Sequence, residues 1–184
     1  MTRDRKRYGM AIDTRTCVGC AACVIACKTE NGVTDRVSRD WITTRTEGTF
    51  PDLRMTIRSE RCNHCEDAPC VAACPTGASY VGPGGTVLVN RAKCTGCKAC
   101  IAACPYGARF VDPATGSVDK CTFCVHRLEN GTSTTACQEV CPTESIVVGD
   151  LEDASSDLVR LLAARAHYAL LPDAGTRPKL FYLS

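Results

Sequence analysis

The clearest indication of the fold is the cysteine run Cys94-Thr-Gly-Cys97-Lys-Ala-Cys100-Ile-Ala-Ala-Cys104-Pro105. Its spacing, C-x2-C-x2-C-x3-C-P, is one by which cysteine thiolates hold 4Fe-4S clusters. Gaps of two residues let one loop present three thiolates to a single cubane, while the fourth cysteine projects towards a second cluster. One such run therefore predicts two clusters.

Comparable cysteine quartets occur four times in this chain of 184 residues. Their spacings differ, since the second has a gap of four residues and the fourth a gap of twelve, but the last three are each followed by proline. Together they use all 16 cysteines, so we expect four 4Fe-4S clusters. The quartets are Cys17, Cys20, Cys23 and Cys27; Cys62, Cys65, Cys70 and Cys74; Cys94, Cys97, Cys100 and Cys104; and Cys121, Cys124, Cys137 and Cys141.

Two other uses of cysteine compete with iron–sulfur ligation. A disulfide framework belongs to secreted proteins, whereas residues 1–10 are polar and basic with no apolar run behind them, so no signal peptide is expected. Zinc sites also use paired cysteines, but the repeated three-residue gap followed by proline matches iron–sulfur runs better. We therefore expect iron–sulfur ligation.

The composition leaves little material for an apolar core. Apolar residues make up 45% of the chain, but this includes the cysteines; without them the share falls to about 36%, and aromatic residues are only 5%. Metal binding can supply the missing folding free energy, so we expect the apoprotein to be largely unfolded. The formal charge of +2 becomes roughly −6 if each of four centres carries about −2, which argues against a nucleic-acid partner.

Short strands and helices are expected around each quartet, which is an α+β ferredoxin-like pattern. Alternating stretches precede the quartets at Tyr8–Asp13 and at 55–58, 86–90 and 116–119, and follow them at Ser79–Val81, 109–111 and 145–148. Alanine-rich segments at 71–74 and 101–104 predict short helices that the following proline helps to end.

Two further segments carry no cysteine. Alternating stretches at 41–46 and 53–58 predict a hairpin inserted between the first two quartets, with Trp41 as a packing anchor. Apolar residues from Leu158 to Ala169 recur at helical spacing after a possible N-cap at 155–157. The final segment, 176–183, is unusually apolar for a chain end, and we expect it to dock on its own fold or on a partner. No window is apolar enough to span a membrane.

The motifs resemble those of one known family. Segments 17–27, 62–78, 94–108, 120–127 and 137–142 are similar to the four-cluster electron-transfer subunits of molybdopterin oxidoreductases, such as those of dimethyl sulfoxide and tetrathionate reductases. The resemblance is strongest to the iron–sulfur subunit of polysulfide/thiosulfate reductases, because segments 149–153 and 176–183 are similar too. It covers nearly the whole chain.

The resemblance implies a pairing of quartets that the spacing alone leaves open. It pairs the first quartet with the fourth and the second with the third, in two intertwined ferredoxin-like units formed by residues 8–40 with 118–150 and by residues 59–117. Residues 41–58 would form the inserted hairpin, and residues 151–184 a C-terminal helix and tail. The implied ligand sets are Cys17, Cys20, Cys23 and Cys141 for cluster 1; Cys27, Cys121, Cys124 and Cys137 for cluster 2; Cys62, Cys65, Cys70 and Cys104 for cluster 3; and Cys74, Cys94, Cys97 and Cys100 for cluster 4.

The same resemblance implies an electron relay between two partners. One is a large molybdopterin catalytic subunit, and the other is an integral membrane subunit that exchanges electrons with quinone, with the outer face of the membrane slightly favoured. The chain itself carries no nucleophile with a base and no open metal position, so we expect no catalysis of its own. A relay for a hydrogenase or formate dehydrogenase, and a free polyferredoxin, are the alternatives.

Several polar residues lie inside the motifs. His64 and His126 are expected to act as hydrogen-bonding or surface groups, because every quartet is complete without them. Four cations could raise the potentials of nearby clusters or lie in solvent: Lys28, Lys98, Lys120 and Arg127.

Overall fold

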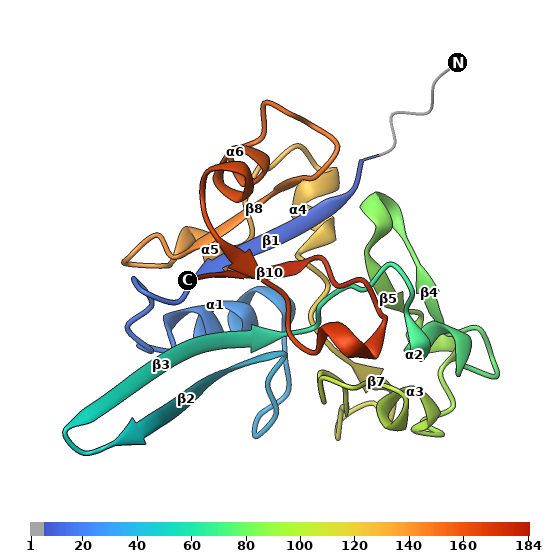
Figure 1. Cartoon of the computed structure of the whole chain (residues 1–184). Helices are drawn as coiled ribbons and strands as arrows, with labels where there is room; N and C mark the ends of the chain where they lie inside the picture. Colours follow the sequence, from blue (N-terminus) through green and yellow to red (C-terminus); the bar gives the residue numbers. More distant parts are fainter. Residues whose placement is uncertain (1–5) are drawn as a thin grey trace.

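A computed structural model describes residues 6–184 and has the expected α+β character (Figure 1). Residues 1–5 lie outside the described part, so the expected lack of a leader segment is not tested there. Among the described residues, no helix combines the length and the apolarity needed to cross a bilayer.

A four-stranded sheet joins the two ends of the described chain. Its strand order is β8 (Ile146–Asp150), β1 (Tyr8–Asp13), β10 (Leu180–Leu183) and β9 (His167–Tyr168). Strand β1 is buried along its whole length, antiparallel to β8 and parallel to β10. It holds the centre of the sheet because its uninterrupted run of buried residues can be covered on both faces.

The segments around the first and fourth quartets lie together. Helix α1 (Ala22–Asn31) packs against α5 (Ala136–Glu139), and the short helix α4 (Val125–Glu129) precedes α5. Helices more than 100 positions apart in sequence, α1 and α5, thus lie side by side (Figure 1).

The second and third quartets lie between two small hairpins. One pairs β4 (Ser79–Val81) with β5 (Val87–Val89), and the other pairs β6 (Phe110–Val111) with β7 (Val118–Asp119). The 3-10 turns η1 (Pro83–Gly85) and η2 (Arg91–Lys93) flank β5. Helices α2 (Pro69–Ala72) and α3 (Ala99–Ala102) pack together, each starting two residues earlier than the alanine-rich segments suggest.

The expected inserted hairpin is present and is longer than predicted. Strands β2 (Asp40–Thr49) and β3 (Asp52–Arg61) pair over their whole length and project from the body of the molecule (Figure 1). At its base, Trp41 packs against the main core, as the anchoring role requires. At its tip, Phe50 is 88% exposed.

The C-terminal helix is shorter than expected, and the apolar tail docks on the fold of its own chain. Helix α6 (Asp157–Ala164) ends before Ala166 and Ala169, because Arg165 takes an extended conformation that leads into β9. After the 3-10 turn η3 (Pro172–Ala174), the apolar tail docks on its own fold as β10. Its Leu180, Tyr182 and Leu183 side chains are fully buried.

Candidate metal centres

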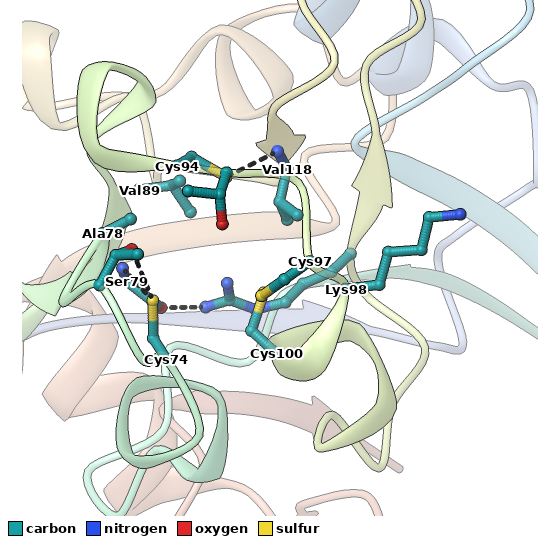
Figure 2. Close-up of a pocket in the computed structure, with 12 residues that line it drawn as sticks. Cys74, Ala78, Ser79, Val89, Cys94, Cys97, Lys98, Cys100 and Val118 are labelled. Carbon is teal, nitrogen blue, oxygen red and sulfur yellow. Dashed lines mark hydrogen bonds between the residues drawn. The ribbon is translucent and has the colours of Figure 1, made fainter.

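Four cysteines from two quartets line one small cavity. Figure 2 shows Cys74 entering from one side, with Cys94, Cys97 and Cys100 placed around the rest of the space. Helix α3 supplies Cys100, the loop before it supplies Cys94 and Cys97, and Cys74 follows helix α2. The thiols expected to share the fourth cluster are therefore grouped around a single space.

A second cavity repeats this arrangement elsewhere in the fold. It is lined by Cys17, Cys20 and Cys23 together with Cys141. The three closely spaced cysteines again come from one loop and the start of a helix, while the remaining one follows a short helix distant in sequence. An equal donor pattern suits two copies of the same bound group.

Of the remaining eight cysteines, six are buried and two, Cys65 and Cys104, are half-buried. Burial raises the pKa of Cys65 to about 11; the Thr176 hydroxyl opposes the rise, and the neighbouring Cys62, Cys70 and Cys104 thiols add to it. Burial likewise raises the pKa of Cys27, and nearby Cys121 and Cys137 reinforce the rise. Burial, together with the charge of Cys137, raises the pKa of Cys124. These mutual effects agree with the second and third expected ligand sets, whose exact membership stays a prediction.

The donor chemistry fits 4Fe-4S clusters. The irons of such a cluster are bound by thiolate sulfurs from four cysteines. Each cavity here is lined by four cysteines that surround a space, as a cluster requires, and do not converge on one point, as the ligands of a single metal ion would. In residues 6–184 no set of three or more histidine, cysteine, aspartate or glutamate side chains converges as the ligands of a single metal ion.

Backbone amides point at several of these sulfurs. The Ser79 amide donates to Cys74 Sγ at 3.3 Å, and the Val118 amide donates to Cys94 Sγ at 3.3 Å (Figure 2). The Ser79 amide lowers the pKa of Cys74. At Cys141, burial raises the pKa, but the Ser145 amide and the Thr143 side chain outweigh it, and the pKa is lowered. Amides that favour thiolate would also tune the potential of a bound cluster.

The two histidines inside the motifs have structural partners other than the cysteines. His64 is fully buried and accepts a hydrogen bond from the Val87 amide at 3.0 Å, while its ring stacks on Phe123. His126 lies at the surface, 2.7 Å from Glu30. These contacts agree with the hydrogen-bonding and surface roles expected for them.

The four cations inside the motifs divide into different roles. Lys28 donates to the carbonyl oxygens of Thr34 and Val37, which fixes a loop. Lys98 is exposed, and Arg127 pairs with Glu139 at the surface. Only Lys120 is fully buried.

Two buried arginines were not among the residues predicted from the sequence. Arg61 Nη1 donates to Cys137 Sγ at 2.9 Å, and Arg109 Nη2 donates to Cys70 Sγ at 2.8 Å. Both side chains are almost completely buried. The only available clue was position, since Arg61 directly precedes a cysteine and Arg109 lies five residues after one.

Comparison with known proteins identifies the family. Residues 53–151 and residues 16–78 each match a model described as a 4Fe-4S dicluster domain. The sequence is 45% identical to a polysulfide reductase chain of Wolinella succinogenes, with 96% of this chain and 93% of that protein covered. The chain belongs to the 4Fe-4S dicluster family. Two other members are the arsenate respiratory reductase iron–sulfur subunit of a Shewanella species, 38% identical with 96% of each chain covered, and a tetrathionate reductase subunit of Salmonella typhimurium, 39% identical with 97% and 73% covered.

Membership in this 4Fe-4S dicluster family confirms the main functional expectation. The chain is an iron–sulfur electron-transfer component and not a catalytic subunit, because its relatives are the iron–sulfur subunits of reductases. Its cofactors are 4Fe-4S clusters.

Proposed function

We propose that this chain relays electrons through four 4Fe-4S clusters, between a large molybdopterin catalytic subunit and an integral membrane subunit that reacts with quinone. The observation that carries the proposal is the grouping of cysteines from different quartets around shared cavities. Such grouping fits a chain of centres held within one fold. The names of the relatives, which include the iron–sulfur subunit of an arsenate respiratory reductase, support a respiratory complex.

The proposed ligand sets follow the four groups of thiols. Cluster 1 takes Cys17, Cys20, Cys23 and Cys141; cluster 2 takes Cys27, Cys121, Cys124 and Cys137; cluster 3 takes Cys62, Cys65, Cys70 and Cys104; cluster 4 takes Cys74, Cys94, Cys97 and Cys100. A bound 4Fe-4S cluster supplies one-electron redox chemistry at a potential set by surrounding charges and hydrogen bonds. The protein supplies the thiolates, amide donors and buried cations described above.

The domain organisation in this proposal is two intertwined ferredoxin-like units. Residues 8–40 with 118–150 form the first, and residues 59–117 form the second. The inserted hairpin, expected at 41–58, extends over Asp40–Arg61 and so into the edges of both units, and residues 151–184 are a C-terminal segment. The pairing of β1 with β8 and the packing of α1 on α5 support the first unit. Attachment to a membrane would come through the partner subunit, with the outer face favoured.

Cofactor content is the direct test of four clusters. Iron and acid-labile sulfide should be measured in the anaerobically isolated chain, with about sixteen irons per chain expected. The variant Cys74→Ser should lose about one cluster, and Thr76→Ala, which changes a neighbouring residue of the same cavity, should retain all four. A native iron content well below sixteen would contradict the proposal.

The partners are tested by isolation from native membranes. Gentle solubilisation should co-purify a large chain that contains molybdenum and a membrane chain. Nickel in place of molybdenum would assign the chain to a hydrogenase. Iron alone, with no partner, would indicate a free polyferredoxin.

A further inference from the structure

The second and fourth quartets begin alike and meet face to face. Arg61-Cys62-Asn-His64-Cys65 and Lys120-Cys121-Thr-Phe123-Cys124 place a cation before the first cysteine and a ring two residues after it. His64 and Phe123 are both buried and both have positive φ, 44° and 53°. Their ring centroids lie 3.8 Å apart with 24° between the ring planes. Equivalent positions therefore contact each other, as they do at a local two-fold axis.

The two cations at this junction cross from one quartet to the other. Arg61, from the second quartet, donates to Sγ of Cys137 in the fourth. Lys120, from the fourth quartet, donates to the carbonyl oxygen of Val87 beside the second quartet and to the Cys121 carbonyl oxygen at 2.7 Å. Val87 lies in one buried cluster with Cys70 of the second quartet, so Lys120 reaches the surroundings of that thiol through Val87. Arg61 therefore contacts a thiol of the opposite quartet, and Lys120 contacts the residue that lies in one buried cluster with such a thiol.

Burial makes these two charges effective. Arg61 and Lys120 are each only 1% exposed, so water does not screen them as it screens surface cations. Within residues 6–184, Lys120 Nζ has no carboxylate within 4 Å, whereas Arg61 has Asp40 at 3.6 Å. The charge of Lys120 is thus the less compensated of the two. Reduction adds negative charge to a cluster, so a fixed positive charge beside its ligands raises the reduction potential.

We infer that Arg61 and Lys120 are a reciprocal pair of positioning residues for electron relay, each fixing the positive charge of one cysteine quartet against the thiolates of the other. They raise the reduction potentials of the clusters on both sides of the junction and so match the two units for electron transfer. This inference rests on the proposed function, since it assigns Cys137 to cluster 2 and Cys70 to cluster 3. The stacked His64 and Phe123 rings hold the two quartets in the arrangement that lets each cation reach the opposite quartet.

The test is potentiometry of the loaded chain, isolated with its partners and followed by electron paramagnetic resonance. Lys120→Met should lower the midpoint of cluster 3, and Arg61→Met should lower that of cluster 2. Lys120→Met should shift the reduction equilibrium by about tenfold or more, which is about 59 mV for a one-electron couple. Cys70→Ser and Cys137→Ser would assign the two signals by altering them selectively.

The chain offers a matched control. Lys93 also directly precedes the first cysteine of a quartet, but its side chain is exposed. Lys93→Met should leave all midpoints within a factor of about two in the equilibrium. Lys120→Arg and Arg61→Lys keep the charge and should keep near-native midpoints.

The outcomes separate this inference from the proposed function. Native protein with fewer than four clusters would contradict the proposed function. If all four clusters are present but neither Met variant changes a midpoint potential, the inference about Arg61 and Lys120 is wrong while the proposed function stands. Shifts no larger than that of Lys93→Met would have the same meaning. If a Met variant fails to load iron, the test uses Lys120→Arg or Arg61→Lys, which keep the positive charge. A tenfold shift in the reduction equilibrium of a cluster in such a variant would contradict an electrostatic role.

Discussion

At the scale of single residues, Asp13 shows how the C-terminal segment is fixed to the sheet. It ends β1 and pairs with Arg165, the residue after α6, and with Arg15 at 3.9 Å. Burial raises the pKa of Asp13, but Arg165 and the Arg15 amide outweigh it and hold the pKa below its usual 3.8. The ion pair with Arg165 is well shielded, whereas the Arg15 side chain is 62% exposed.

Arg165→Met should therefore lower the free energy of unfolding by about 1.5–3 kcal/mol at pH 7. Thermal melting of the loaded protein measures this, and Arg15→Met, the exposed partner, should cost less than about 0.5 kcal/mol. Because the pKa of Asp13 is lower in the folded state, its contribution is complete above pH 3.8 and is lost as the pH falls through the folded value. The difference in the free energy of unfolding between the native protein and Arg165→Met should therefore disappear in acid. Equal losses for Arg165→Met and Arg15→Met at pH 7 would contradict the role of the Asp13–Arg165 pair.

The cysteines could be predicted from the sequence, but the charges around them could not. Ligand spacing is local, so the quartets were recognisable without coordinates. Arg61 and Arg109 are buried because thiols distant in sequence accept their hydrogen bonds, and no local pattern encodes such a partner. The sequence does not distinguish Lys120 from the other cations in the motifs, because its hydrogen-bond acceptor, the Val87 carbonyl oxygen, lies in β5, 33 positions away.

At the scale of elements, β10 should contribute strongly to stability. Leu180 is fully buried between β1 and the rest of the main core. Leu180→Ala should lower the free energy of unfolding by about 2–5 kcal/mol, because it leaves a cavity that the sheet cannot close. Leu171→Ala removes the same atoms from a side chain that is 51% exposed, so its effect should be within about 0.5 kcal/mol. Urea unfolding of the loaded protein would distinguish them, and a mild Leu180→Ala phenotype would mean that the tail docks weakly.

Elements with a strict alternating pattern were predicted well, and those whose pattern is ambiguous were not. The hairpin β2–β3 and strand β1 follow alternation or apolar runs that only a strand satisfies. Ala166 and Ala169 fit a helical period by chance, because alanine suits both states, and the pairing of β9 with β10 ends the helix first. That the tail would dock was one of two expectations; its parallel pairing with β1 depends on a contact between residues about 170 positions apart.

At the scale of the whole molecule, cluster loading should depend on pH. In the unfolded apoprotein a cysteine thiol has a pKa of about 8.5, and in the folded chain burial raises the pKa of Cys121 to about 12 and that of Cys65 to about 11, so these thiols are protonated at neutral pH in both states. Iron binds thiolates and must displace these protons, so loading should improve as the pH rises. Under limiting iron, reconstitution of the apoprotein at about pH 8.5 should yield more bound iron than at about pH 6.5, with proton release detectable by an indicator dye. Equal loading at both values would contradict protonated ligand thiols.

Removing the iron should unfold most of the chain. Cysteines form part of the main core beside Met10, Ile12 and Tyr182, so the core is partly built from metal ligands. Without the clusters, the cavities lined by those thiols are empty. The limited apolar surface cannot then offset the conformational entropy that the chain loses on folding. Anaerobic chelation should abolish the cooperative thermal transition and most amide protection from hydrogen exchange, and reconstitution should restore both. A chelated protein that keeps native protection in β1 and β10 would mean that the sheet folds without the clusters.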